Sequence, residues 1–270
     1  MDVVVEAVVR LLFIEPRRIK IKRDGMRFRL HLAYHGGAYH GWQRQPNAVT
    51  VQEVIERALS QLFQQEIELI GAGRTDTGVH ARFYVAHFDA TALPIPTERL
   101  LYVLNGLLPR DIVLFEIAEA SPTFHARFDA TRRTYEYLLL RHKDPFLTDE
   151  AYLYTAPLDF QLLNEGAQLL MHYEDFASFC KTGTDAHTTI CHLFESTWEV
   201  KGNLWVYRVA ADRFLRNMVR ALVGTLLDLG RKRISLNEFQ QIIEAKDRGM
   251  AGASAPPQGL YLVNVEYPQA

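Results

Sequence analysis

The chain has 270 residues, of which 48% are hydrophobic and 23% are charged, and its formal net charge is −2. This composition is typical of a folded globular protein with one large domain or two small ones, and it argues against a disordered chain. The apolar runs are far shorter than a membrane span, so we expect no membrane partner. Because the net charge is slightly negative, a nucleic-acid partner would have to bind to a local basic surface.

Residues 1–25 differ in composition from the rest of the chain. An apolar stretch at 3–14 comes before a basic stretch that contains Arg17, Arg18, Lys20, Lys22 and Arg23. A secretory signal peptide has its positive charges before its apolar region, so this order is wrong for one. We interpret 1–25 as an extension outside the fold, with Met26 as the functional start. A basic arm that touches RNA is the alternative.

The first half of the chain predicts the element order βαββαβ. Thr50 is expected to cap the first helix, with Glu53 three residues later completing a capping box, and alternating or short apolar runs predict the strands. In chain order the elements are a strand at Arg27–Tyr34, a helix over 51–62, strands at Ile67–Ile70 and Phe83–Phe88, a helix at Thr97–Leu108 capped by Thr97, and a strand at Asp111–Ala118.

The second half loosely repeats this order. Gly202-Asn203 predicts a hairpin turn, and Ser235 with Glu238 predicts a helix start. The expected elements are a strand at Thr134–Leu140, a helix at Leu158–Met171, strands at Leu193–Val200 and Leu204–Val209, a helix at Phe214–Leu229 closed by Gly230, a helix at Ser235–Ala245 and a strand at Leu260–Val265.

These patterns predict an α+β fold with two ferredoxin-like halves of the βαββαβ type, an N-terminal domain at 26–122 and a C-terminal domain at 123–270. Each half is expected to have its own antiparallel sheet. The two sheets would meet across a central catalytic cleft, because ligands favour such junctions.

The segment 71–81, G-A-G-R-T-D-T-G-V-H-A, concentrates glycines and polar residues between two apolar runs. Glycine allows a loop to hold conformations that other residues avoid, and loops on a rigid scaffold often carry catalytic groups. Asp76 is the leading catalytic candidate, because a nearby arginine such as Arg74 keeps a carboxylate ionised and oriented. The alternatives are an aspartate that caps a turn and, for His80, either a base or a buried structural histidine.

Two further segments, 36–45 and 124–137, combine aromatic and basic side chains. Aromatic rings next to cations stack on bases and pair with phosphates. The second segment leads into a strand whose Tyr135 is placed to stack on a base. The alternatives are a packed loop with Trp42 in the core and a surface strand with solvated arginines. The candidate RNA contacts are His40, Trp42, Arg44, His125 and Arg127.

The segment 214–224 places Arg220 beside an apolar helical stripe. An arginine against an apolar stripe usually needs an anionic partner, and Asp76 is a candidate for that partner. Gly224, four residues later, would let another stretch of backbone come near the helix.

Cys180, His187, Cys191 and His192 are close enough in sequence to raise the question of a metal site. Their spacing lacks the paired C-x2-C pattern of zinc modules, and adjacent residues on a strand point to opposite faces. We therefore expect ordinary packing residues and no metal, and a zinc-dependent nucleobase enzyme is an alternative hypothesis. The two cysteines cannot make a disulfide framework, which suits a reducing cytoplasm.

Five motifs occur in one order along the chain. They are Y-H-G-W-Q-R-Q at 39–45, A-G-R-T-D-x-G-V-H at 72–80, F-H-A-R-F at 124–128, M-V-R at 218–220 with V-G at 223–224, and G-L-Y-L at 259–262. Together they resemble the tRNA pseudouridine synthase A family, from about Arg27 to the end of the chain. His35 departs from the family pattern, which commonly has an aspartate in a Tyr-Asp-Gly turn.

The resemblance implies an isomerase that converts uridine to pseudouridine at positions 38, 39 and 40 in the anticodon stem-loop of tRNA. It implies a homodimer without metal or organic cofactor. In the site, it implies that Asp76 is the catalytic aspartate and that Arg220 pairs with it. Tyr135 would stack against the target uracil and help remove the C5 proton, and Arg74 would displace the base from the stem. A non-catalytic RNA-binding protein of the same fold is the alternative.

Overall fold

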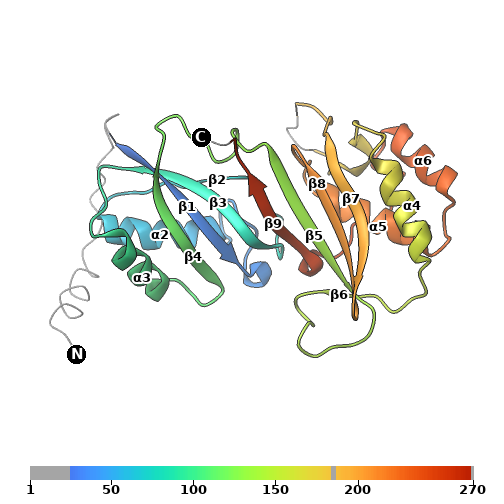
Figure 1. Cartoon of the computed structure of the whole chain (residues 1–270), viewed down its shortest axis with the longest axis horizontal. Helices are drawn as coiled ribbons and strands as arrows, with labels where there is room; N and C mark the ends of the chain where they lie inside the picture. The colour runs from blue at the N-terminus through green and yellow to red at the C-terminus, as the bar shows by residue number, and fades with distance from the viewer. Residues whose placement is uncertain (1–24, 184–186, 269–270) are drawn as a thin grey trace.

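One mixed sheet runs through the molecule (Figure 1). The computed structural model describes residues 25–183 and 187–268, and within these ranges the sheet has nine strands. Their order is β4-β1-β3-β9-β5-β8-β7, with the short strands β2 and β6 pairing with β3 and β5 at the side. Residues 1–24 of the expected extension lie outside the described residues.

The first half has the predicted order of elements. They are β1 (Met26–Tyr34), the 3-10 turn η1 (Gly36–Ala38), α2 (Val51–Phe63), β2 (Ile70–Gly71), β3 (His80–Ala90), α3 (Thr97–Leu107) and β4 (Ile112–Ala120). The Thr50 side chain accepts a hydrogen bond from the Glu53 amide, as expected of the cap of α2. The cap expected at Thr97 is wrong: Pro96 holds the extended N-cap conformation and Thr97 is already helical.

The second half adds strands on both sides of β5 and three helices. The elements are β5 (Arg132–Leu140), β6 (Tyr152–Leu153), α4 (Phe160–Leu170), the 3-10 turn η2 (Ala177–Phe179), β7 (Leu193–Lys201), β8 (Leu204–Ala211), α5 (Met218–Gly230), α6 (Leu236–Ala245), the 3-10 turn η3 (Pro257–Gly259) and β9 (Leu260–Glu266). Ser235 and Glu238 form the predicted capping box of α6.

Helix α5 begins four residues later than predicted. Asn217 is its N-cap and has a φ of 66°, a left-handed conformation that a helix cannot continue through. Residues 214–217 therefore form a loop that leads into the helix, and Phe214 belongs to this loop.

The expectation of two separate antiparallel sheets is wrong, because β9 joins them. It pairs in parallel with β3, where His80 lies opposite Tyr261, and antiparallel with β5. Leu262 of β9 packs in the core of the first half and Leu260 in the core of the second. Hydrogen bonding thus continues from one half of the molecule to the other.

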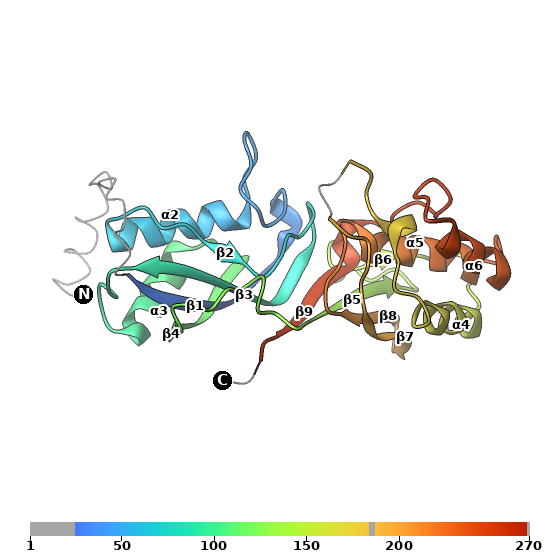
Figure 2. The ribbon, with the colours of Figure 1, turned by 90° about the horizontal axis from the view of Figure 1, so that it is seen from above.

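The two larger of the three hydrophobic clusters in the described residues lie on either side of the β3–β9 junction. In the first, Leu30 and Tyr84 of the sheet pack with helices α2 and α3, and in the second, Tyr137 packs with α4, α5 and α6. Figure 2 shows α2 and α3 beside the strands of the first half and α4, α5 and α6 at the opposite end of the molecule. No helix among the described residues is long and apolar enough to cross a membrane.

Candidate active site

Asp76 and Arg220 form an ion pair between the two halves of the molecule. Asp76 lies in the loop between β2 and β3, and Arg220 lies in the first turn of α5. Nη1 of Arg220 is 3.3 Å from Oδ2 of Asp76, and both side chains are mostly buried, with exposed fractions of 19% and 26%. The direct contact predicted from the sequence is therefore present.

The orientation of Arg220 is set by the backbone beside it. Nε of Arg220 donates to the Ala255 carbonyl at 2.7 Å, and the Ala255 amide donates back to the Arg220 carbonyl at 2.9 Å. A Cβ at Gly224 would lie only 1.7 Å from the Ala253 carbonyl oxygen. The predicted close approach of another backbone at Gly224 is thus confirmed, and it holds this stretch against α5.

The first half holds the Asp76 loop from the other side. The hydroxyls of Tyr34 and Thr75 are 2.9 Å apart, and the Trp42 amide donates to the Thr75 carbonyl. Gly41 has a φ of +86°, and a Cβ there would lie 2.3 Å from the Thr75 oxygen. Only glycine fits so close to the Thr75 oxygen. The Asp76 loop is therefore held by the first half on one side and contacts Arg220 of α5 on the other.

Tyr135 lies on β5 between the two cores. Its ring meets the Phe214 ring edge to face, with centroids 5.1 Å apart. Burial raises the pKa of Tyr135 to about 12, with Arg133 opposing the rise and the Asp76 carboxylate adding to it. An uncharged aromatic wall therefore lies near the carboxylate.

His80 is a buried residue whose ring joins two backbone segments through hydrogen bonds. Its Nδ1 accepts a hydrogen bond from the Gly36 amide at 3.0 Å, and its Nε2 lies 3.1 Å from the Gln258 carbonyl, to which it donates in the neutral form. The residue is 1% exposed, and burial lowers its pKa to about 4. His80 thereby ties η1 to the segment before β9. The ring of His35, the departure from the family pattern, packs 4.2 Å from it.

Arg74 is exposed. Among the described residues the ion-pair partner of Asp76 is Arg220 and not Arg74, the arginine that the sequence placed near the carboxylate. The Arg74 guanidinium lies at the surface of the same loop, two residues from the carboxylate.

The candidate RNA contacts divide into one core residue and four accessible ones. Trp42 is 3% exposed and stacks on Tyr84 with centroids 4.0 Å apart, so it belongs to the core and is not available to a base. This result favours the packing alternative for Trp42. His40, Arg44 and Arg127 are exposed and His125 is half-buried.

Phe128 is a surface aromatic that the sequence analysis did not single out. Its side chain is 73% exposed, the Arg127 guanidinium lies 5.5 Å from its ring centre, and the His125 ring lies at 4.3 Å. The sequence pattern that could have indicated an exposed aromatic ring is a phenylalanine between an arginine and an aspartate in a polar segment. The exposed Arg127 and Phe128 and the half-buried His125 thus form one group of aromatic and basic side chains.

The cysteine and histidine segment does not form a metal site in the described part of the chain, which contains no group of three or more His, Cys, Asp or Glu residues placed to hold an ion. Cys180 and Cys191 are buried in the second core. Burial raises the pKa of the Cys191 thiol to about 12, which disfavours the thiolate that a metal needs. His187 and His192 are exposed.

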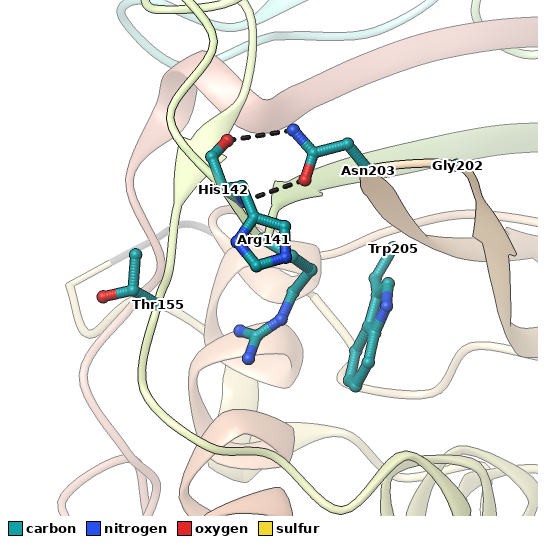
Figure 3. A pocket seen from close by; sticks show the side chains of 6 residues that line it. All are labelled: Arg141, His142, Thr155, Gly202, Asn203 and Trp205. Atoms are coloured by element: carbon teal, nitrogen blue, oxygen red, sulfur yellow. Dashed lines mark hydrogen bonds between the residues drawn. The ribbon is translucent and has the colours of Figure 1, made fainter.

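A separate pocket of about 370 Å³ lies at the β7–β8 hairpin and contains none of the residues around Asp76 (Figure 3). The Asn203 side chain bonds both the amide and the carbonyl of His142. Arg141 lies 4.7 Å from the Trp205 ring centre and donates to the carbonyls of Tyr154 and Ala156. Arg141 therefore holds residues 154–156 in place through hydrogen bonds to their backbone.

Comparisons with known proteins identify the family of the chain. A family model described as tRNA pseudouridine synthase matches residues 32–129 and 167–268. The tRNA pseudouridine synthase A of Bacteroides fragilis is 49% identical over 90% of this chain and 97% of that protein. The enzymes of the same name from Parabacteroides distasonis and Thermoanaerobacter pseudethanolicus are 47% and 42% identical, over 90% and 87% of this chain and 96% of each relative.

Among solved structures, a crystal structure of the archaeal box H/ACA sRNP Nop10-Cbf5 complex aligns with 85% of this chain and 60% of that chain. The TM-score is 0.32 and the identity 14%, so this distant similarity adds no weight to the assignment. The family model and these relatives show that the chain is an isomerase. It belongs to the tRNA pseudouridine synthase family.

Proposed function

We propose that this enzyme converts uridine to pseudouridine at positions 38, 39 and 40 in the anticodon stem-loop of tRNA, with Asp76 as the catalytic residue. The observation that carries the proposal is the mostly buried Asp76–Arg220 ion pair, with its 3.3 Å contact, beside the aromatic wall of Tyr135. The close relatives bear the name tRNA pseudouridine synthase A.

The reaction needs one well-placed carboxylate. The C1′–N1 bond of the nucleotide breaks, the uracil turns over, and C5 bonds to C1′ while the C5 proton leaves and N1 gains a proton. Asp76 begins this sequence by attacking C1′ or by removing the 2′ proton. Arg220, fixed by Ala255, holds the carboxylate in place, and such preorganisation lowers the barrier.

Tyr135 stacks on the target uracil and assists removal of the C5 proton as a neutral relay, its oxygen accepting that proton while its own O–H proton passes to a second acceptor. With a pKa of about 12, set first by burial, the phenol stays uncharged at neutral pH. Together with Phe214 it forms an apolar surface that keeps water from the detached sugar.

The tRNA is held by exposed basic and aromatic side chains near the site. Arg74 displaces the target base, whose removal from the stack costs a few kcal/mol. His40, Arg44, His125 and Arg127 contact the RNA, and Phe128 offers a face on which a base can stack. Since the whole chain has a net charge of −2, these local contacts supply the attraction to phosphate.

We also propose that the enzyme is a cytoplasmic homodimer with two α+β halves, and that it uses neither metal nor organic cofactor. An isomerisation has no net redox change, and a carboxylate supplies the chemistry. The two buried cysteines suit a reducing compartment.

The test is a chemical map of pseudouridine in tRNA incubated with the wild type and with Asp76→Asn, which keeps the size of the side chain. We expect Asp76→Asn to bind tRNA but to form pseudouridine at least ~10³-fold more slowly. Asp149→Asn, at an exposed aspartate, is the control and should match the wild type. Equal maps from wild type and Asp76→Asn would instead support a non-catalytic RNA-binding protein.

A further inference from the structure

Arg133 places a cation among backbone carbonyls near the proposed site. Its Nη1 donates to the carbonyls of Ala130 and Asp212 at 2.8 and 2.6 Å, and its Nη2 donates to those of Ala72 and Arg127 at 3.2 and 2.5 Å. No ion pair of Arg133 with a carboxylate occurs within the described ranges. One guanidinium group therefore donates hydrogen bonds to four backbone carbonyls.

These carbonyls come from three separate stretches of chain. Ala72 begins the loop that carries Asp76. Residues 127 and 130 belong to the stretch that presents the exposed Phe128. Asp212 follows β8 and leads through the 213–217 loop to α5, which carries Arg220. One side chain thus links the segments that hold the carboxylate, its arginine partner and the proposed RNA contacts.

The guanidinium group is suited to this task and other side chains are not. It offers five N–H donors in a rigid planar fork, whereas lysine offers a single flexible ammonium. Burial lowers the pKa of Arg133, which is the cost of placing the cation there. The fixed fork sets the spacing between the three stretches.

We propose that Arg133 is a positioning residue, which aligns the Asp76 loop with the 124–130 stretch so that the carboxylate meets C1′ of the bound uridine. The inference rests on the proposed function, in which Asp76 is the catalytic group. It extends that function to a residue that touches neither the reacting atoms nor the carboxylate.

Arg141 provides a matched control. Its guanidinium also donates to two loop carbonyls, of Tyr154 and Ala156, but it lines the pocket at the β7–β8 hairpin (Figure 3). Both Arg133→Lys and Arg141→Lys remove a guanidinium from loop carbonyls. Only Arg133→Lys removes a guanidinium that donates to the start of the Asp76 loop, at the Ala72 carbonyl.

The experiment measures kcat and KM for tRNA with both variants, and the Tm of each. We expect Arg133→Lys to lower kcat about 10- to 100-fold with KM within about threefold of the wild type, because a shift of about 1 Å in a reacting group has this effect. Arg141→Lys should lower the Tm by a similar amount and leave kcat unchanged. Rates are normalised to the fraction of enzyme that binds tRNA, so partial unfolding does not imitate the effect.

A second variant covers the case in which the lysine protein folds poorly. Arg133→Ala leaves a space for a free guanidinium ion, and dilute guanidinium chloride should restore kcat where sodium chloride does not. Unchanged kcat in folded Arg133→Lys, an effect confined to KM, or equal loss of kcat in Arg141→Lys would each overturn the inference. Wild-type activity in Asp76→Asn would overturn the proposed catalytic role itself, whatever Arg133 does.

Discussion

The Asp76 loop and the 180–192 segment both concentrate chemically reactive side chains, but the fold places them differently. Asp76 lies where the two halves meet, and its partner Arg220 comes from residues far along the chain. Cys180 and Cys191 pack inside one core, and His187 and His192 lie at the surface. Reactive residue types become a site only where the fold brings complementary groups from different segments together.

The ion pair offers the sharpest way to test this difference. Arg220→Lys keeps a positive charge but removes the fork that joins Asp76 to the Ala255 carbonyl. We expect kcat to fall about 10- to 100-fold, because the carboxylate loses its fixed orientation. The measurement is the rate of pseudouridine formation at saturating tRNA.

The control is an ion pair of the same type outside the site. Arg233 contacts Asp228 at 2.9 Å with the arginine 55% exposed, and exposed pairs contribute about 0–1 kcal/mol to stability. Arg233→Lys should therefore leave the rate unchanged. If the two lysine variants had equal rates, the buried pair would have no special part in the reaction.

His80, the first residue of β3 after the Asp76 loop, is expected to affect stability. Burial lowers the pKa of His80 to about 4, against about 6.5 in an unfolded chain. The unfolded state therefore binds the proton more readily, so the stability is fully present above pH ~6.5 and is lost as the pH falls towards 4. The expected loss from this residue between pH 7 and pH 5 is roughly 2 kcal/mol.

Urea unfolding at pH 7 and pH 5 measures this loss. Burial lowers the pKa of His87 to about 4 as well, so the wild type has both contributions. His80→Gln should remove one of them and reduce the pH dependence, while His142→Gln at an exposed histidine should not. An unaltered pH dependence in His80→Gln would show that His80 is not held neutral by the fold.

The smallest effect is expected in the 180–192 segment. Cys191 is fully buried in the second core, so Cys191→Ala should remove a packing contact and lower the free energy of unfolding by about 1 kcal/mol. The rate of pseudouridine formation should stay at the wild-type value. A large loss of rate in Cys191→Ala would show that the 180–192 segment takes part in the reaction. Zinc bound to the wild type but not to Cys191→Ala would show that the segment is a metal site.

Much of the local structure could be predicted from the sequence. Alternating apolar residues located β1, and the helical stripe after Thr50 located α2, because each pattern reflects which face of a single element is buried. Helix starts were less secure. The conformations of Pro96 and Asn217 moved the expected cap of α3 and the start of α5.

The site was predicted in part, and for a different reason. Asp76 was a candidate partner of Arg220 because an arginine beside an apolar stripe needs an anion at any distance along the chain, and the family resemblance implied the pair. The same reasoning did not exclude Trp42 as an RNA contact, since an aromatic ring suits both a core and a surface. It also did not find the role of Arg133, whose partners are backbone carbonyls that leave no pattern in the sequence.

The sequence alone determined the order of the long strands and the helices, the glycine-rich loop and the reactive residues on it, because these depend on local periodicity, turns and charge. The tertiary structure alone decided that β9 joins the halves into one sheet and that Arg133 donates to carbonyls of three separate stretches of chain. Every residue except proline carries the same backbone N–H and C=O groups, so the sequence does not show which of these groups will pair. Their pairing is chosen only when distant segments bury their apolar faces together.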